Sequence, residues 1–267
     1  MFSPSSVDVW FPSEFIRKAL ADICLYTLAI FFYNGIIWHI LSFKLSGKTS
    51  TNITQASYRL VNFTVNFGFS FFGIYYWYFQ MEELHGWGRI VYSNLSLFAH
   101  WQLAYQLWAI PMGLITEESQ LMMLHHLGVI SASISPAFCT MGMRYESVYF
   151  LGVIEVSSVF LAVMNYFKDN PELIKMHPMV YSSTRLIFAV LFIVIRVIFF
   201  FPNLYIYLEG LSTIYSARKD IDQMILVLMG VTSAVMLGLM QIFWAYLILK
   251  GLAKMLFGRG GNGGKNK

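Results

Sequence analysis

The sequence predicts an all-α polytopic membrane protein, and three observations carry this prediction. Hydrophobic residues make up 57% of the chain and charged residues only 12%, whereas about a quarter of the residues in soluble domains are charged. The mean hydropathy of +0.60 is correspondingly high. The apolar residues also fall into segments of about 20, the length that a helix needs to cross a bilayer. We therefore expect a bundle of transmembrane helices.

Seven segments reach or approach this length, and short connections join them. We expect seven transmembrane helices at residues 19–43, 58–80, 90–114, 119–138, 148–167, 184–208 and 221–249. No Pro/Gly/Ser-rich linker divides the chain into halves. The predicted organisation is an N-terminal segment with the first helix (1–51), one helical domain (52–257) and a flexible Gly/Lys tail (258–267).

Most of the predicted spans have a recognisable boundary. The first fifteen residues lack the basic region of a signal peptide, so the first helix is expected to stay in the membrane. The second span closes on the aromatic run 75–78, which is typical of an interfacial belt. Three prolines near the ends of other spans are expected to end or kink helices, with neighbouring groups satisfying the freed carbonyls: Pro111, Pro136 and Pro202.

Orientation follows from the basic residues near the span ends, because cytosolic loops carry more Lys and Arg. One side has six: Arg17, Lys18, Arg89, Arg144, Arg218 and Lys219. The other side has eleven: Lys44, Lys48, Arg59, Lys168, Lys175, Arg185, Lys250, Lys254, Arg259, Lys265 and Lys267. We therefore expect a lumenal N-terminus and a cytosolic C-terminus. This orientation places the glycosylation acceptor Asn52-Ile53-Thr54 in a cytosolic loop.

Two adjacent histidines, His125 and His126, lie inside the fourth span. Imidazoles are costly in hydrocarbon, so their presence there is a functional hypothesis by default. They follow Ser119 by some six residues, which places them about 10 Å below the cytosolic surface. Adjacent helical residues point about 100° apart, so one of the two is expected to face a cavity and the other a neighbouring helix. Catalysis, structural polar packing and contact with a lipid headgroup are all compatible with this placement.

Further polar residues fall at similar depth on the neighbouring spans. They are His100, Gln102, Gln106, Glu155, Arg196 and Gln241. With the histidines they come from five different helices and occupy a band of about two helical turns. We expect them to line one polar interior, in which Glu155 and Arg196 form an ion pair because each alone is expensive in lipid. The pair either pins two helices together or shapes the cavity.

Several classes of site are not expected. Cys24 and Cys139 are the only cysteines, which excludes a disulfide scaffold and a Cys-based metal cluster. The adjacent histidines have no His-x3-His or carboxylate spacing, so no metal site is expected. The net charge of +4 is modest and the basic residues are scattered, which does not indicate a nucleic-acid partner.

Five stretches of the chain, taken together, are similar to one known family. They are Leu-His-His-Leu-Gly at 124–128, Glu-Val-Ser-Ser-Val-Phe-Leu at 155–161, Phe-Ile-Val-Ile-Arg at 192–196 with Pro202 downstream, Gln-Ile-Phe-Trp-Ala-Tyr at 241–246, and Arg59. In order and spacing they resemble the TLC domain family, which includes ceramide synthases and translocating-chain-associated membrane proteins. The resemblance covers about residues 52–256.

The resemblance implies a six-helix barrel in the endoplasmic reticulum, preceded by one extra helix. In ceramide synthases the barrel opens to the cytosol, and the paired histidines serve transfer of an acyl chain from acyl-CoA. It therefore implies His125 and His126 as catalytic residues, with acyl-CoA as co-substrate and no bound cofactor. The expected partners are membrane lipids and a long-chain acyl group. A neutral imidazole is suited to such a role because its pKa lies near the working pH.

The chain also departs from ceramide synthases. No aspartate accompanies Glu155 in its helix before Asp169, and the position of an expected aspartate on the third span is taken by Gln106. Where many members have a histidine after the opening arginine, this chain has Val65 and Asn66. The homeobox-like insertion of some ceramide synthases is absent.

Three function classes follow from these observations. The first is an acyl-CoA-dependent N- or O-acyltransferase, which the cytosol-facing histidines favour. The second is a non-enzymatic lipid-binding protein that senses, transports or regulates membrane lipid composition, which the missing aspartates favour. The third is a seven-helix receptor, supported only by span count and orientation. The chain lacks the Asp-Arg-Tyr and Asn-Pro-x-x-Tyr signatures of such receptors, and its last span has no lysine that could bind retinal. The sequence leaves the oligomeric state open, a homo-oligomer included.

Overall fold

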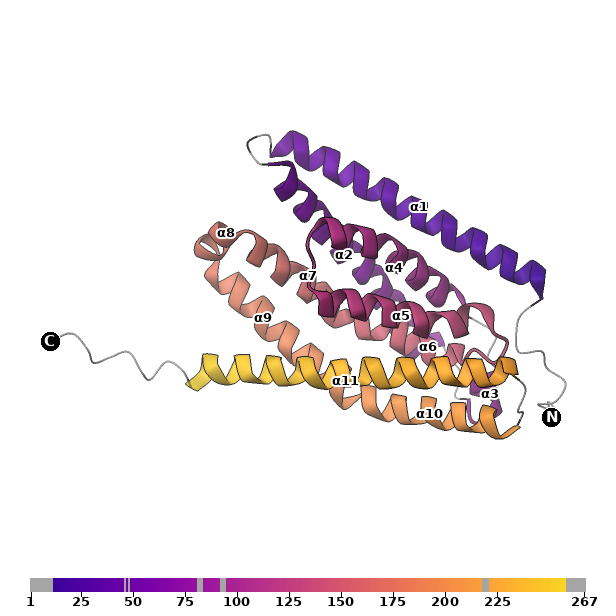
Figure 1. The fold of residues 1–267 in the computed structure, drawn as a ribbon. Coiled ribbons are helices and arrows are strands. Elements are labelled where there is room, and N and C mark those ends of the chain that lie inside the picture. The colour runs from indigo at the N-terminus through magenta and orange to yellow at the C-terminus, as the bar shows by residue number, and fades with distance from the viewer. Residues whose placement is uncertain are drawn as a thin grey trace.

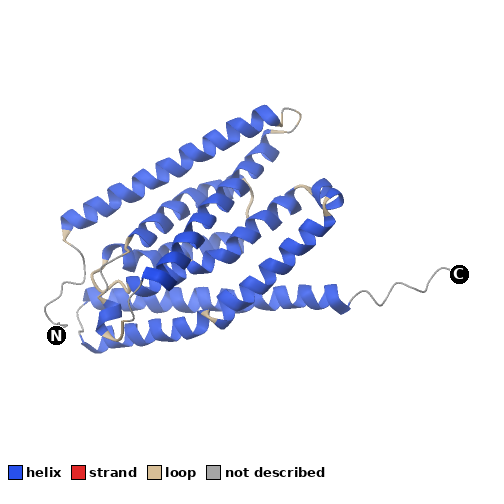
Figure 2. Cartoon of the chain, turned by 180° about the vertical axis from the view of Figure 1, so that it is seen from behind, coloured by secondary structure: helices blue, strands red, loops and turns tan. Residues whose placement is uncertain are grey.

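The computed structural model describes residues 12–257, except 46, 48, 81–83, 92–94 and 218–220, with the side chains of 255–257 also outside the description. The described chain is a bundle of helices without a strand (Figures 1 and 2). The predicted Gly/Lys tail 258–267 lies outside the described residues. So do six of the basic residues used for the orientation: Lys48, Arg218, Lys219, Arg259, Lys265 and Lys267.

The helices follow one another as an up-and-down bundle (Figure 1). The first part of the chain forms α1 (Ser13–Lys44), α2 (Ser50–Tyr75) with the π-helical turn Tyr76–Gln80, the short α3 (Trp87–Ile90), α4 (Leu97–Ile115) and α5 (Gln120–Phe138). The second part forms α6 (Arg144–Leu151), the 3-10 turn Val153–Glu155, α7 (Val156–Asp169), α8 (Pro171–Met176), α9 (Pro178–Ile193), the π-helical turn Val194–Ile198, α10 (Phe200–Ala217) and α11 (Ile221–Phe257).

Five of the described helical segments are long and apolar enough to cross a membrane. They are Ser13–Lys44, Gln120–Phe138, Arg144–Asp169, Pro178–Ala217 and Ile221–Lys254. Helices α2 and α4 occupy two further predicted spans but are less apolar. Their polar residues, such as Asn62 and Asn66 on α2 and Gln102 and Gln106 on α4, are buried inside the bundle. The chain is therefore a multi-pass membrane protein with five candidate membrane-spanning segments among the described residues.

Three predicted helices differ clearly from the observed ones. The span expected at 184–208 is longer, Pro178–Ala217, and contains the π-helical turn Val194–Ile198. The span expected at 90–114 begins only at Leu97, because Leu95 has a left-handed φ of 67° that an α-helix cannot continue. The span expected at 148–167 begins earlier, at Arg144, and is broken at Gly152, whose φ of −128° and ψ of −72° interrupt the helix. Average hydropathy does not show either break.

The outer surface of the bundle is apolar, as expected for contact with lipid tails. Large side chains are exposed on several helices, among them Phe32, Leu114, Leu228 and Leu239. Helix α1 packs along α2 and α4 at one side of the bundle, while α5 packs against α4 and α11. In Figure 1, α1 begins and α11 ends at opposite ends of the bundle. Helix α5 therefore has packed neighbours on two sides, while Leu124 and Leu127 are exposed on its outer face.

Candidate functional site

Helix α5 positions the two histidines. Its N-terminus is capped by Ser119, whose hydroxyl accepts a hydrogen bond of 3.3 Å from the Met122 backbone N–H. His125 and His126 are both buried and point to different neighbours. His126 contacts Gln106 on α4, and His125 contacts Trp244 on α11. His126 meets a neighbouring helix as expected, but both rings also line one polar cavity with Gln106 and Glu155.

His126 begins a chain of side-chain hydrogen bonds through the interior. Its Nδ1 lies 2.5 Å from the Gln106 Oε1. Gln106 Nε2 donates to the Gln102 Oε1 at 3.2 Å, and Gln102 Nε2 donates to the Glu155 Oε1 at 3.1 Å. An amide oxygen only accepts, so the His126 Nδ1 carries the hydrogen. The chain thus fixes the tautomer of His126.

The chain ends in the ion pair expected between Glu155 and Arg196. The Arg196 Nη2 lies 3.1 Å from the Glu155 Oε2, and both side chains are buried. Ser157 and Ser158 accept further hydrogen bonds from the guanidinium, at 2.8 Å from Nε and 2.9 Å from Nη2. The backbone carbonyl of Ile154 accepts from Nε at 3.2 Å. A buried ion pair needs such additional partners to offset its desolvation.

Local backbone irregularities place both charged residues. Glu155 ends the 3-10 turn after the break at Gly152, and Arg196 lies in the π-helical turn of Val194–Ile198. Gly152 packs against Gly73 of α2 so closely that a Cβ on Gly152 would lie 2.9 Å from the Gly73 Cα. This close crossing lies next to Glu155, whose carboxylate accepts a hydrogen bond from Gln102 on α4. π-Helical turns occur frequently at functional sites.

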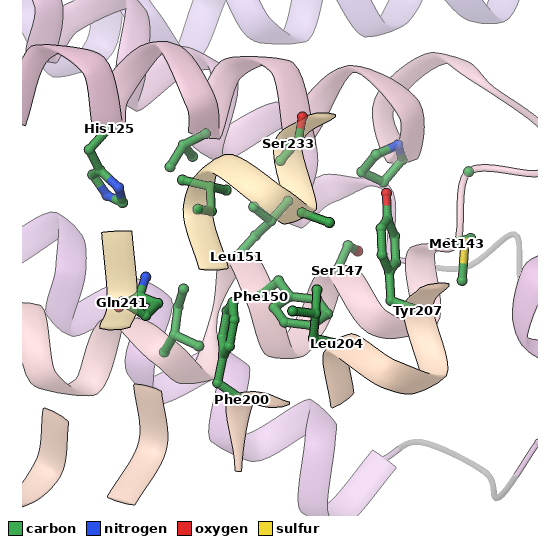
Figure 3. Close-up of a pocket in the computed structure, with 17 residues that line it drawn as sticks. His125, Met143, Ser147, Phe150, Leu151, Phe200, Leu204, Tyr207, Ser233 and Gln241 are labelled. Atoms are coloured by element: carbon green, nitrogen blue, oxygen red, sulfur yellow. The ribbon is translucent and has the colours of Figure 1, made fainter. Parts of the chain in front are cut away.

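His125 faces an apolar cavity between α5, α6, α10 and α11 (Figure 3). The cavity is narrow and almost entirely apolar, as are many sites that hold an amphiphilic small molecule. Its walls include Phe150, Leu204 and Leu237, and it extends from His125 toward Met143. Figure 3 shows His125 and Met143 at opposite ends of the labelled side chains. The shape and lining suit an alkyl chain.

A second, more polar cavity meets the first at His125. Its lining includes Glu118 and Ser119 at the start of α5, Lys168 at the end of α7, and Arg196. The start of α5 and the end of α7 lie toward the end of the bundle where α11 terminates, and Arg196 lies deeper, at the junction of α9 and α10 (Figure 1). His125 is shared by both linings, so its ring stands between a polar opening and an apolar interior.

The ring nitrogens of the two histidines differ in their surroundings. The Nδ1 of His125 and the Nε2 of His126 have no hydrogen-bond partner among the described residues. Trp244 approaches the His125 ring edge-on, with 5.2 Å between ring centroids. His125 is therefore held by packing against Trp244, and its Nδ1 is a buried polar atom without a hydrogen-bond partner among the described residues.

The remaining predicted residues lie at different places. Gln241 is buried on α11 and lines the apolar cavity with His125, at the left of Figure 3. His100 lies apart from the hydrogen-bond chain, with its Nε2 3.4 Å from the Ala137 carbonyl oxygen, and it lines neither cavity of His125. Gln102 lies behind Gln106, within the chain rather than in a cavity wall.

The sequence analysis did not single out Trp244, Ser157 or Ser158 as site residues. It also missed a polar cluster on α2, where Asn62 accepts from the Tyr105 hydroxyl at 2.9 Å and Asn66 donates to it at 3.4 Å. The spacing of Asn62, Asn66 and Ser70 at intervals of four is a signal that could have revealed a polar helix face.

A metal centre is not found in the described part of the chain, since no group of three or more His, Cys, Asp or Glu residues converges there. Of the two cysteines, Cys24 is exposed and Cys139 is buried, and neither forms a disulfide. The described side chains of the site offer imidazole, amide, carboxylate and guanidinium groups.

The fold and the site define a multi-pass membrane protein with a polar cluster and an apolar cavity inside its helical bundle. A family model described as the TLC domain matches residues 52–250. The chain belongs to this family. No curated protein and no solved structure gave a significant match.

Proposed function

We propose that this protein binds a long acyl chain within its bundle and transfers it from acyl-CoA to a lipid amine or hydroxyl. The observation that carries the proposal is the position of His125, which stands where the polar opening meets the apolar cavity. A thioester carbonyl placed at this junction has its alkyl chain in the apolar cavity and its polar part in the opening. The TLC domain match supports the proposal.

The apolar cavity supplies binding energy for the chain. Each methylene moved from water into an apolar environment contributes about 0.8 kcal/mol. A few polar groups, His125, Ser147, Ser233 and Gln241, lie along the otherwise apolar wall. This arrangement, an apolar pocket with few polar groups, is typical of sites that hold and orient an amphiphile.

His125 has two chemical roles open to it. As a general base, an imidazole nitrogen of His125 takes the proton from the acceptor amine or hydroxyl while the acceptor attacks the thioester carbonyl and the thiolate of coenzyme A departs. As a nucleophile, the nitrogen itself takes the acyl group with loss of the thiolate, and the acceptor then releases the imidazole. His126 is a positioning residue in both cases, because its Nδ1 is held by Gln106.

A non-enzymatic lipid-binding protein is the second candidate, and one observation favours it. The carboxylate of Glu155 bonds Gln102 and Arg196 rather than His125. His125 thus lacks the carboxylate partner that orients many catalytic histidines. Under this alternative the same cavity holds a lipid without reaction.

Incubation of the purified protein with radiolabelled long-chain acyl-CoA and a membrane lipid extract tests the proposal. We expect a labelled lipid product with wild type and none with His125→Ala. His177→Ala is the matched control, since His177 is exposed on the segment between α8 and α9. Intact-mass spectrometry separates the two roles, because only the nucleophile retains an acyl group on the protein. Product formation unchanged by His125→Ala would overturn the transferase proposal, and co-purified lipid without turnover would favour the second candidate.

We also propose residence in the endoplasmic reticulum with a lumenal N-terminus and a cytosolic C-terminus. The basic residues Lys168, Lys175 and Arg185 support this orientation, since they belong to the end of the bundle where α11 terminates. The polar opening of the site lies at the same end, where cytosolic acyl-CoA would arrive.

A further inference from the structure

Two basic side chains converge on an opening in the side of the bundle. Lys168 at the end of α7 and Arg185 on α9 line a pocket whose other wall is formed by α11, at Leu247, Ile248 and Gly251. Figures 1 and 2 show α9 and α11 diverging toward this end of the bundle after crossing near its middle. The pocket is open to the outside of the bundle.

Neither cation has a carboxylate partner within the described residues. The nearby acids Glu118 and Asp169 form ion pairs with Arg59, the second at 2.8 Å from Nε. Arg185 itself rests on the Tyr181 ring, with 5.5 Å from its Cζ to the ring centroid. Two like charges therefore share one pocket, and an anion placed between them would be stabilised by both.

This pocket is continuous with the opening of the site. Lys168, Phe188, Leu247 and Ile248 line both this pocket and the polar cavity that leads to His125. The shared wall is apolar apart from the lysine. A molecule with an anionic head at Lys168 and Arg185 can thus direct an alkyl chain along Phe188 and Leu247 toward His125.

We propose that Lys168 and Arg185 bind the phosphate of an acyl-bearing amphiphile at this lateral opening. The proposal rests on the proposed binding of an acyl chain in the bundle. Arg offers a planar fork of donors that matches phosphate oxygens, and Lys adds a point charge. The phosphate belongs either to coenzyme A or to the headgroup of a phospholipid entering from the adjacent leaflet.

Binding of two fluorescent probes to the purified full-length protein tests this proposal. One probe is a long-chain alcohol, and the other is its monophosphate. In Lys168→Gln/Arg185→Gln we expect at least about tenfold weaker binding of the monophosphate, as for loss of charge-assisted hydrogen bonds, and unchanged binding of the alcohol. Lys44→Gln/Lys175→Gln is the charge-matched control, because both lysines are exposed on other helices.

Each outcome has a distinct meaning. If affinity for the monophosphate fell equally in both double variants, or fell in neither, the proposed phosphate site would be overturned. Failure of wild type to bind the alcohol would overturn the proposed acyl-chain binding instead. Retained alcohol binding in the Lys168/Arg185 variant also shows that it is folded. Displacement of the monophosphate by free coenzyme A identifies coenzyme A as the source of the phosphate. Displacement by phosphatidic acid alone identifies a lipid headgroup.

Discussion

His126 donates a hydrogen bond of 2.5 Å from its Nδ1 to the Gln106 Oε1, and the two bonds that follow run in the same direction. Both amides donate toward the carboxylate of Glu155, which accepts from Gln102 on one oxygen and from Arg196 on the other. The polar residues on four helical segments therefore form one oriented network, which holds α5 beside α4 and fixes one face of the site.

Gln106→Leu removes two hydrogen bonds: the one that Gln106 accepts from His126 and the one that Gln106 donates to Gln102. A buried group left without its partner costs about 1–3 kcal/mol, so we expect a lower unfolding temperature in detergent and weaker acyl transfer. Thermal unfolding and the radiolabel assay measure the two effects. Gln120→Leu, on the exposed first residue of α5, serves as control. If the two substitutions lowered stability equally, the network would have no special role.

Breaking the buried ion pair from one side should be costlier than removing both charges. Removal of one partner costs about 3–5 kcal/mol because the other charge stays buried and uncompensated. We expect Glu155→Gln to destabilise the protein more than Glu155→Gln/Arg196→Met does. Glu172→Gln tests an exposed pair, since Glu172 and Lys175 lie 3.0 Å apart at the surface, and it should change stability by less than about 1 kcal/mol. Additive losses in the double variant would contradict a coupled pair.

Ala234→Phe should shorten the chain that the apolar cavity accepts. Ala234 is buried and lines the cavity beyond His125, whereas Val235, the next residue of α11, is exposed. The phenyl ring introduced at 234 fills space that the alkyl chain would occupy. The preferred acyl chain should therefore become shorter by several methylenes. Lipid mass spectrometry of co-purified chains, or transfer rates across an acyl-CoA series, measures this shift. Val235→Phe should leave the preference unchanged, and the same shift in both variants would place the chain elsewhere.

Gly152→Ala should severely destabilise the bundle. The new Cβ would lie 2.6 Å from the Val148 carbonyl oxygen and 2.9 Å from the Gly73 Cα, and backbone cannot move aside cheaply. Gly68→Ala is the control, because nothing lies within 4 Å of a Cβ built there and alanine favours a helix by about 0.8–1 kcal/mol over glycine. The yield of monodisperse protein and the unfolding temperature distinguish them. Normal yield and stability of Gly152→Ala would show that the α2 crossing is loosely packed.

The orientation is testable by glycosylation in cells. Asn52, exposed at the start of α2, should remain unmodified if this end of the bundle is cytosolic. Pro4→Asn creates the acceptor Asn-Ser-Ser at residues 4–6, which should be glycosylated if the N-terminus is lumenal. A mobility shift removed by glycosidase reports either event. Modification of Asn52 in wild type would invert the orientation.

The expected ion pair of Glu155 and Arg196 is present because the two residues had few alternatives. Both lie well inside their apolar spans, away from the charges at the span ends, and charges inside a membrane pair with one another. The linkage of Gln102 and Gln106 between His126 and Glu155 was not predictable in the same way. Depth along a helix follows from counting residues, but rotation about the helix axis decides which amide meets which partner.

The sequence alone determined that the chain is a helical membrane protein, that polar residues meet in its interior, and that His125 and His126 lie among them. Hydropathy and residue spacing are sufficient for these points, because they depend only on distance along each helix. The tertiary structure decided that His126 belongs to the hydrogen-bond network while His125 faces Trp244 and the cavities. The break at Gly152 and the π-helical turn at Val194–Ile198 rotate the helices that they interrupt. Such rotations arise from packing between distant segments, which a pattern along one segment does not contain.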